Sequence, residues 1–402
     1  MSDKRSPAII FVFITILIDV IGIGIIIPVV PQLIKELTGG TLSEAAQYAG
    51  WLSFSYSVML FVFSPIMGGL SDQFGRRPVI LASLLGLGVD YVFLGFAPTI
   101  TWLFVGRILA GITGASFTTA TAYIADVSEP EKRAQNFGLV GAAFGVGFIL
   151  GPTLGGLLAD YGARVPFFAS AGLALLNWVY GYFVLPESLS IENRRAFDWK
   201  RANPISSLAN LKRYPIVLSL LWPLVFLYVA GYATQSTWTY YTMEKFGWSS
   251  KSVGLSLGFV GLMVAIVQGG LTRIILPKLG EKKSVFLGLT FNSLGNLGFA
   301  LASAGWMMYA IMVPYAFGGL AGPAIQGIAS KQVPANAQGE LQGTLTSILS
   351  VTAIFGPVLM TSLFSYFTSP SAPVHFPGAP FLAAAILAVV SLVLARRALA
   401  KF

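Results

Sequence analysis

Cysteine is absent from this chain of 402 residues, and histidine occurs once, at His375. Without cysteine the chain has neither a disulfide framework nor a thiolate metal site. Charged residues make up only 10% of the sequence, whereas a soluble chain of this length carries about 25%. The sequence also has no Walker-type nucleotide loop and no basic region interleaved with exposed aromatic residues. We therefore expect no cofactor, no metal and no nucleic-acid partner.

Hydrophobic residues make up 55% of the chain and gather in long runs. Runs of about 20 apolar residues are long enough for a helix to cross the ~30 Å hydrocarbon core of a bilayer, where helices satisfy every backbone hydrogen bond internally. The sequence thus predicts an all-α membrane protein of twelve transmembrane helices surrounded by lipid. The polar breaks place these spans at 8–34, 46–70, 78–97, 101–125, 135–159, 165–185, 215–243, 251–275, 284–303, 305–329, 339–367 and 379–398.

The distribution of lysine and arginine predicts the orientation. With both termini in the cytoplasm, most of the 25 cations fall in cytoplasmic segments, as the positive-inside rule requires. The net charge of +9 therefore reflects topology. Residues 1–7 lead directly into a span too long for a signal-peptide core, so we expect the first helix to be its own signal anchor. The expected location is a cell (inner) membrane, crossed many times.

The chain divides into two similar halves. Residues 187–214 form the one long polar segment and read as a cytoplasmic linker between an N-terminal six-helix bundle, 1–186, and a C-terminal six-helix bundle, 215–402. Three short motifs of the first half recur about 205 residues later in the chain. Gly151-Pro152 recurs as Gly356-Pro357, Ile124-Ala125 as Ile328-Ala329, and Gly75-Arg76-Arg77 as Gly280-Glu281-Lys282-Lys283. Duplicated halves around a site near the bilayer midplane are typical of secondary transporters.

A tight cationic turn separates two of the apolar spans. It is Gly68-Gly69-Leu70-Ser71-Asp72-Gln73-Phe74-Gly75-Arg76-Arg77-Pro78, and residues 68–77 are called the latch loop below. The pattern Gly-x-Leu-x-Asp-x-x-Gly-Arg-Arg resembles the loop between helices 2 and 3 of the major facilitator superfamily of transporters. The resemblance implies that fold, with two pseudo-symmetric bundles.

Further motifs resemble the twelve-helix drug–proton antiporters, and within them the tetracycline exporter family. They are Asp19-x-x-Gly22-x-Gly24-x-x-x-Pro28-x-x-Pro31, Val89-Asp90-Tyr91, Gly106-Arg107-Ile108, Gly147-x-x-x-Gly151-Pro152-x-x-Gly155-Gly156 and Gln338-Gly339-Glu340-Leu341-Gln342-Gly343. The resemblance implies a secondary active transporter, not an enzyme, that exchanges inward-moving protons for an amphiphilic small molecule or drug, with antibiotic resistance as one consequence. We expect it to work as a monomer.

Asp19, Asp90 and Arg107 lie well inside predicted spans, away from the span ends. Charges at such depth are costly and are usually functional. We predict that they couple transport to protons, and a buried Asp90–Arg107 clamp that only fixes helix packing is the alternative. For the latch loop, the resemblance and an expected Arg76–Asp126 ion pair imply a conformational latch made of Gly68, Asp72, Gly75, Arg76, Arg77 and Asp126. A hinge between the halves is predicted at Gly147, Gly151, Pro152, Gly155 and Gly156, residues that also suit close packing between helices.

The second half carries no acid in mid-span. Its candidate substrate-binding residues are Gln235, Trp238, Tyr241, Gln268, Asn292, Asn296 and Gln326; the aromatic pair is equally consistent with an interfacial belt. Here the chain departs from the tetracycline exporters, because Val264 stands where their histidine does and Asn292 where their aspartate does. We therefore predict weak export of a metal–tetracycline chelate.

Other functions are consistent with parts of the sequence. Export or flipping of a lipid, glycolipid or metabolite by the same fold is the main alternative, followed by solute import. A membrane enzyme would need a convergent set of catalytic groups at one depth, which one loop histidine and no cysteine do not provide. A receptor without turnover would differ in a transport assay.

Overall fold

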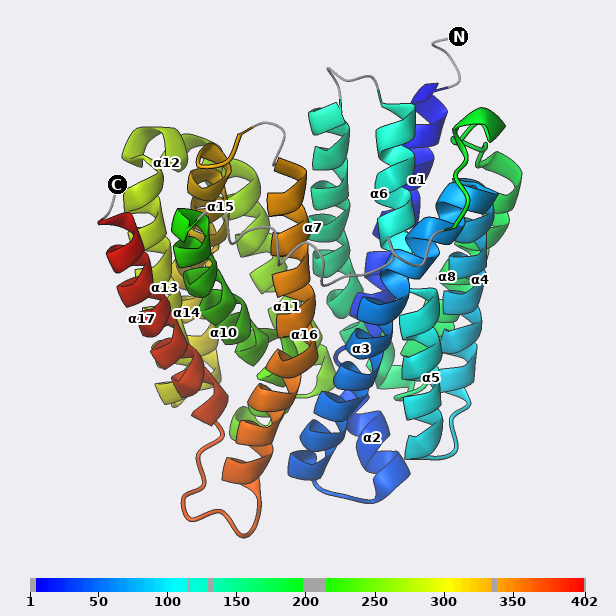
Figure 1. Ribbon diagram of the computed structural model, residues 1–402. Helices are drawn as coiled ribbons and strands as arrows, with labels where there is room; N and C mark the ends of the chain where they lie inside the picture. The colour runs from blue at the N-terminus through cyan, green and yellow to red at the C-terminus, as the bar shows by residue number, and fades with distance from the viewer. Residues whose placement is uncertain (1–4, 115, 129–132, 198–214, 335–337, 401–402) are drawn as a thin grey trace. The chain divides into compact units, whose positions relative to one another are not determined.

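The computed structural model describes residues 5–114, 116–128, 133–197, 215–334 and 338–400, and every regular element in these ranges is a helix (Figure 1). The predicted all-α membrane fold is confirmed. The first half of the sequence forms α1 (Arg5–Ile26), α2 (Val30–Thr38), α3 (Leu42–Phe74), α4 (Arg76–Gly95), α5 (Ile100–Thr113), α6 (Ser116–Val127), α7 (Arg133–Leu158), η1 (Ala159–Tyr161), α8 (Val165–Val184) and η2 (Ile191–Asn193).

The second half of the sequence has two irregular turns inside its helical runs. Its elements are α10 (Pro215–Phe246), α11 (Ser250–Val264), the π-helix η4 (Ala265–Leu271), α12 (Thr272–Leu279), α13 (Glu281–Leu301), α14 (Gly305–Ala316), the 3₁₀ helix η5 (Phe317–Leu320), α15 (Ala321–Lys331), α16 (Gln338–Thr368) and α17 (Ala379–Leu399). Thus α11, η4 and α12 continue one another, as do α14, η5 and α15.

Ten of the described helices, some of them continuous runs of these elements, are long and apolar enough to cross a membrane. The bent pair α1–α2 adds an eleventh. This pair differs from the single straight span predicted at 8–34, because the helix turns by 48° at residues 27–29, where Pro28 has no backbone N–H to donate. The predicted span 101–125 corresponds to α5 and α6, and residue 115 between them lies outside the described ranges. A total of twelve spans stays a prediction.

The chain folds into two compact units. The first consists of Met1–Gly39, Ser55–Asn203 and Ser250–Gly258, and the second of Gly40–Phe54, Pro204–Ser249 and Phe259–Phe402. Long helices are shared between them, since the start of α3 belongs to the second unit and the start of α11 to the first. The domain limits 1–186 and 215–402 remain a prediction.

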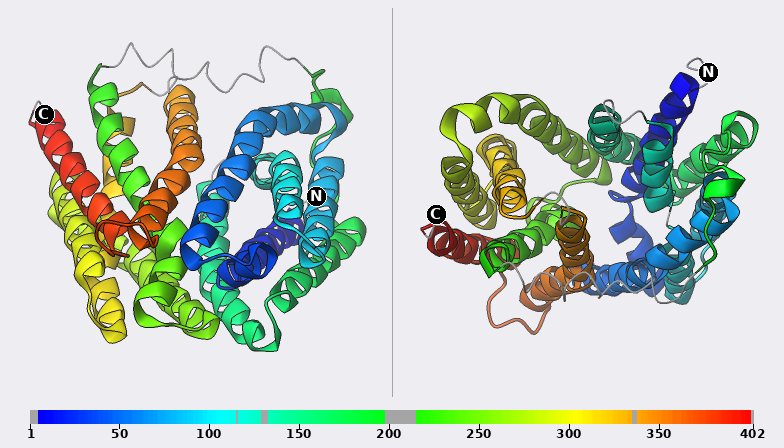
Figure 2. Two further views of the ribbon diagram at one scale, coloured as in Figure 1. Left: turned by 90° about the horizontal axis from the view of Figure 1, so that it is seen from below. Right: turned by 45° about the horizontal axis from the view of Figure 1, so that its top comes forward.

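In the first unit, α1 packs along α7 and α8, and α4 packs along α8 (Figure 2). The core holds Phe11, Val12 and Ile16 of α1 together with Tyr123 and Ile124 of α6, all at most 3% exposed. This packing fixes the depth at which the ionisable residues of α1 and α4 lie.

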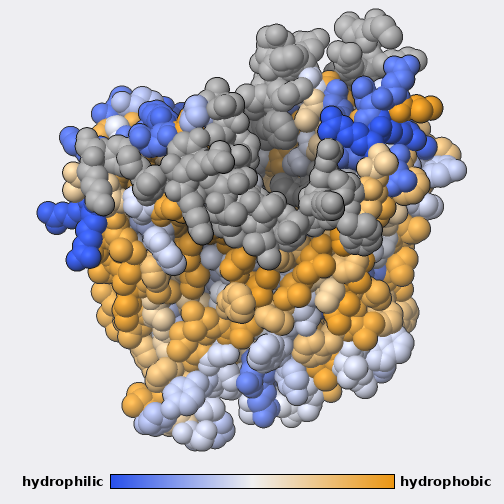
Figure 3. Space-filling model, in the orientation of Figure 1, coloured by the Kyte–Doolittle hydropathy of each residue, from blue (hydrophilic) through white to orange (hydrophobic). Residues whose placement is uncertain are grey.

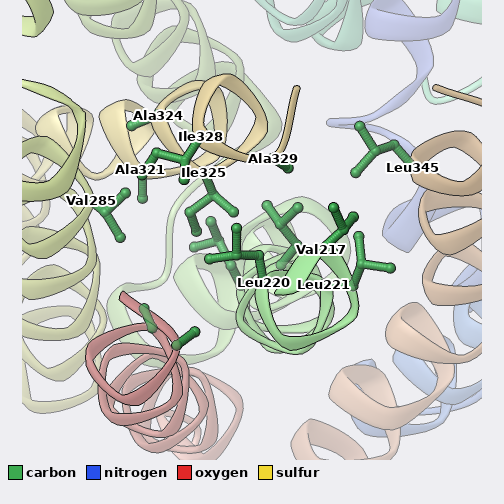
Figure 4. Packing of buried hydrophobic residues seen from close by; sticks show 14 of the residues in the cluster. Val217, Leu220, Leu221, Val285, Ala321, Ala324, Ile325, Ile328, Ala329 and Leu345 are labelled. Carbon is green, nitrogen blue, oxygen red and sulfur yellow. The ribbon is translucent and has the colours of Figure 1, made fainter. Parts of the chain in front are cut away.

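In the second unit, α17 packs against α10 and α13, and α10 also packs against α16. The core lies between α10, α13, α15 and α16, and Val217, Leu221, Val285, Ile325 and Leu345 belong to its one extended cluster (Figure 4). Apolar side chains also cover the outer faces of the helices, and hydrophilic residues gather at the helix ends (Figure 3). Surfaces of this kind suit helices that are solvated by lipid.

Candidate functional site

Asp90 and Arg107 form a buried ion pair that joins α4 to α5. Arg107 Nη2 donates to Asp90 Oδ2 at 2.8 Å, and the side chains are only 21% and 2% exposed, respectively. The guanidinium also lies over the ring of Tyr56 on α3, with its Cζ 5.7 Å from the ring centroid. The pair considered from the sequence is therefore present in the structure. A proton-coupling role for it stays a prediction.

Gly106 permits this pair to form. A Cβ atom at Gly106 would lie 2.8 Å from Asp90 Oδ1 and 2.6 Å from Leu94 Cδ2, closer than side chains tolerate. The lack of a side chain thus lets α5 approach α4 at the depth of the ion pair. Asp90 Oδ1 is buried and has no hydrogen-bond partner among the described residues, so only one oxygen of this carboxylate is compensated there.

Asp19 lies on α1 between two hydrogen bonds that join α1 to α8. Thr15 Oγ1 donates to Asn177 Oδ1 at 3.4 Å, and Ser170 Oγ donates to Gly22 O at 3.0 Å. Ser170 and Asn177 are almost fully buried and were not predicted as site residues. The position of an asparagine in the middle of an apolar span was the signal that identifies Asn177.

Gly22 also connects α1 to α4. A Cβ atom there would lie 3.5 Å from the ring and the hydroxyl of Tyr91, which follows Asp90 in the chain. Asp19 is one helical turn from Gly22. Asp19 is therefore near in sequence to the residue of α1 that contacts α4. The ion pair itself is formed by Asp90 and Arg107.

The predicted hinge residues of α7 face two different helices. They are Gly147, Gly151, Pro152, Gly155 and Gly156. The first four contact α1: a Cβ atom at Gly151 would lie 2.8 Å from Gly24 Cα, and one at Gly24 would lie 2.8 Å from Pro152 Cδ. Gly156 instead faces α11, where its Cβ would lie 3.0 Å from Gly254 Cα. These contacts are close helix packing through small residues, and movement at this hinge stays a prediction.

Arg76 joins the latch loop to α6 and also binds other residues of the loop. Its Nε donates to Asp126 Oδ2 of α6 at 3.1 Å, and its Nη1 contacts Asp72 Oδ1 and Ser71 Oγ, each at 2.5 Å. The Arg76 side chain is only 11% exposed. The expected Arg76–Asp126 ion pair is thus present, and its role as a latch stays a prediction.

The other predicted latch residues surround this pair. Arg77 Nη2 donates to Tyr182 O at the end of α8, at 2.7 Å. Gly75 has a φ of +107°, a backbone conformation that favours glycine. A Cβ atom at Gly68 would meet nothing within 4 Å, so no contact made by this residue in the structure explains the glycine.

The second unit contains a related ion pair with reversed charges. Lys331 Nζ of α15 lies 2.9 Å from Glu281 Oε1 of α13, and each member follows its counterpart in the Arg76–Asp126 pair by 205 residues. Glycines with positive φ precede both helix starts, +107° at Gly75 and +77° at Gly280. The reversed pair is the more exposed of the two, with 68% of Lys331 accessible.

The amide candidates of the second unit form separate polar groups. Asn296 Nδ2 donates to Asn292 O and Oδ1 at 2.9 and 3.0 Å, and Gln326 Nε2 donates to Tyr228 OH at 2.9 Å. Gln268 is exposed and lies in the π-helix η4, a type of irregularity that is frequent at functional sites.

Two short glycine contacts tie these amides to η5. A Cβ atom at Gly318 would lie 3.1 Å from Asn292 Cβ, and one at Gly319 would collide with the Gln268 side chain. The double glycine therefore makes room for both amides at the break between α14 and α15. Sequence reasoning had given no role to these glycines.

The predicted aromatic candidates have a different environment. Trp238 and Tyr241 are 2% and 0% exposed, and both pack against Phe381. Tyr241 OH donates to Phe299 O. This burial favours a packing role for the two rings over stacking on a substrate, whereas Gln235 of the same helix is exposed.

Metal-ligand clusters are not found in the described part of the chain, where no group of three or more His, Cys, Asp or Glu side chains converges. The one histidine, His375, lies 3.6 Å from Glu244 Oε1 at the end of α10 and is 58% exposed.

Comparison with known proteins agrees with this architecture. The family model described as Major Facilitator Superfamily matches residues 12–347. The tetracycline resistance protein of class C from Escherichia coli is 38% identical over 90% of this chain and 91% of its own length. The class H protein from Pasteurella multocida is 33% identical over 97% and 96%. The chain therefore belongs to the major facilitator superfamily, and within it to the family of the tetracycline resistance proteins.

More distant proteins share the fold. Multidrug resistance protein 2 of Bacillus subtilis is 29% identical over 97% of this chain and 94% of its own length. A bacterial homologue of the human lysosomal transporter Spinster, solved in an inward-facing unoccupied conformation, matches with a TM-score of 0.77 at 16% identity, over 100% of this chain and 98% of its own. The human organic anion transporter MFSD10 matches with a TM-score of 0.70 at 22% identity, over 97% and 99%.

Proposed function

We propose that this protein is a proton-coupled antiporter that exports an amphiphilic small molecule or drug across a cell (inner) membrane. The observation that carries the proposal is the buried Asp90–Arg107 pair in a chain that belongs to this transporter family. We further propose that it acts as a monomer in the lipid bilayer, with both termini in the cytoplasm and two six-helix bundles at 1–186 and 215–402.

The pair has the chemistry that coupling needs. When Asp90 takes up a proton, its attraction for Arg107 is lost and the buried guanidinium must find another partner. The ring of Tyr56 already lies beside it. A cationic group of a substrate that pairs with the Asp90 carboxylate therefore competes with the proton, and Asp19 provides a second carboxylate on α1. Competition of this kind exchanges protons for substrate.

The second half would supply neutral contacts. Gln268, Asn292 and Gln326 offer amide hydrogen bonds without charge, and the exposed Gln268 and Gln235 are the most accessible of the candidates. Such a set suits neutral or cationic amphiphiles better than a metal chelate, because divalent ions prefer carboxylate ligands. The relatives' resistance to tetracycline makes that drug the first compound to compare.

The test is transport in proteoliposomes with an imposed pH gradient. Tetracycline, ethidium and a set of neutral lipophilic drugs would be compared, each with and without a protonophore, and with sodium and potassium exchanged. We expect uptake of at least one amphiphile that follows the pH gradient and is abolished by the protonophore. Transport driven by sodium alone, or movement of a lipid or metabolite but of no drug, would contradict the proposal. Reporter fusions at both termini test the orientation separately.

A further inference from the structure

The start of helix α4 has no capping group of its own. Its N-cap residue is Gly75, which has no side chain to accept a hydrogen bond, although the first amides of a helix need acceptors from outside the helix. Glu187, which follows α8, supplies them. Its Oε1 accepts the Arg76 amide at 2.9 Å and its Oε2 accepts the Arg77 amide at 3.3 Å. An anion at this position is also favoured by the helix dipole.

Gly75 is needed for this arrangement on two grounds. Its positive φ suits glycine, and a Cβ atom there would collide with the Glu187 carboxylate. The N-cap residue thus has no side chain that could cap the helix. The capping carboxylate comes instead from a residue more than a hundred positions later in the chain. The carboxylate is held in turn by the amides of Ser188 and Leu189, both 3.0 Å from Oε1.

The residue after Glu187 holds the other member of the ion pair. Ser188 Oγ donates to Asp126 Oδ2 at 3.1 Å, the same oxygen that Arg76 Nε reaches. Tyr123, on the same helix as Asp126, donates from its hydroxyl to Pro186 O at 3.0 Å. Two adjacent residues therefore hold the two members of the ion pair. Glu187 binds the main-chain amide of Arg76, and Ser188 binds the carboxylate of Asp126.

The contacts continue along the latch loop. Arg195 N donates to Asp72 O at 3.1 Å, and Phe197 N donates to Gln73 Oε1 at 3.3 Å. A Cβ atom at Gly69 would lie 2.7 Å from Phe197 Cδ2, so the ring occupies the space that the glycine leaves. Residues 187–197 thus lie against the end of α3 as well as the start of α4.

We infer that Glu187 is a positioning residue of the latch loop, which caps α4 and, with Ser188, holds Arg76 and Asp126 in the geometry of their ion pair. The inference rests on the proposed transport function. Loss of the carboxylate releases the main chain of Arg76, which weakens the ion pair and slows the conformational cycle. Substrate binding should be unaffected, because the contacts that Glu187 makes in the described part of the chain are with latch-loop residues and with its own segment.

The first test measures the cap without a substrate. Amide hydrogen exchange of the purified protein in nanodiscs, followed in peptides that contain Arg76 and Arg77, compares wild type with Glu187→Ala and Glu187→Gln. We expect exchange at these amides to accelerate about two- to thirtyfold in Glu187→Ala, the range expected for loss of a helix N-cap. Glu187→Gln keeps one carbonyl oxygen and should show a smaller change. Glu192→Ala, which removes an exposed carboxylate of the same segment, should show none.

The second test measures transport of tetracycline and of ethidium in proteoliposomes. We expect Glu187→Ala to slow turnover of the transported probe severalfold at unchanged affinity, with partial recovery in Glu187→Gln. If Glu187 acts through Arg76, the double variant Arg76→Ala/Glu187→Ala should be little slower than Arg76→Ala alone. If Glu187 instead acted independently of Arg76, the turnover rate of the double variant would fall by the product of the two single effects.

Three results would overturn the inference. They are unchanged exchange at Arg76 and Arg77 in Glu187→Ala, a double variant slowed by the product of the single effects, and failure of both Glu187 variants to insert while Arg76→Ala inserts normally. A wild-type protein that moves neither probe would count against the proposed function instead, and the exchange measurement would still decide whether Glu187 caps α4.

Discussion

Removal of Arg107 should damage the protein more than removal of both members of its ion pair. The charges of Arg107 and Asp90 are in direct contact, with Nη2 and Oδ2 2.8 Å apart and the Asp90 side chain 2% exposed. With about 4 Å between charge centres and an effective dielectric constant of about 20, their attraction is about 4 kcal/mol. Because Arg107 keeps 21% of its side chain accessible, about 2–4 kcal/mol is the better expectation.

Arg107→Ala leaves the Asp90 carboxylate buried and uncompensated, which is the costly way to break a buried pair. The double variant Asp90→Asn/Arg107→Ala removes the charge as well and should recover much of the lost stability. Thermal unfolding in detergent, measured for wild type, both single variants and the double variant, gives the coupling energy. Arg107→Lys, which keeps the charge, is the matched control.

The reasoning is refuted if the single effects simply add. Additivity would mean that the two residues stabilise the protein independently and that their contact contributes nothing measurable. The same four variants in the pH-gradient transport assay separate packing from coupling. If the double variant regains stability but not gradient-driven transport, the pair is needed for coupling and not only for packing.

Three other expectations concern single sites. Asp19→Asn should abolish pH-driven transport in proteoliposomes while the protein still inserts and folds; uptake at the wild-type rate would remove Asp19 from the mechanism. Arg76→Ala should slow turnover with little change in equilibrium substrate binding, and a collapse of affinity in binding titrations at normal turnover would make the latch loop a substrate site. Magnesium–tetracycline export should be weak and should rise in the Val264→His/Asn292→Asp double variant; strong magnesium-dependent resistance of drug-sensitive bacteria that express the wild type would contradict this.

A fourth expectation concerns the α4–α5 contact. Gly106→Ala should destabilise the protein by about 1–3 kcal/mol, the usual cost of inserting a methyl group into a packed interior, because the new Cβ would meet Asp90 Oδ1 and Leu94 Cδ2. Gly141→Ala is the matched control, since a Cβ there would meet nothing within 4 Å. Equal melting temperatures for the two variants in detergent would show that α5 is free to move away from α4.

Much of the fold is predictable because lipid imposes a simple rule on the sequence. Each membrane helix needs a long apolar run, so the polar breaks mark most helix ends. The exceptions are local: α1 bends at residues 27–29, and the span predicted at 251–275 contains the π-helix η4. Hydropathy has no period that distinguishes a π turn from an α turn, so this irregularity could not be predicted.

The candidate site was predictable where charge was out of place. Asp90, Arg107 and the Arg76–Asp126 pair all stand out against apolar surroundings. Glu187 does not, since it opens a polar segment in which a carboxylate is unremarkable, and its contact with Gly75 depends on how α8 returns to α4. Trp238 and Tyr241 show the converse limit. An aromatic residue near a helix end is consistent with a substrate site, a membrane interface or a protein core. Only the three-dimensional structure distinguishes these roles, because it shows both rings packed against Phe381.

The reversed ion pair Glu281–Lys331 shows what a reversal of charge at a helix junction requires. Starting from a pair like Arg76–Asp126, replacement of one member alone puts two like charges in contact, and such contacts are unfavourable. The swap therefore needs either a second replacement soon after the first or a neutral residue in between. Once complete, the swap leaves one cation in the pair, as before, so the number of cations at that helix junction, which the positive-inside rule counts, is unchanged. The two junctions thus share an attraction between two helix ends, and only its direction differs.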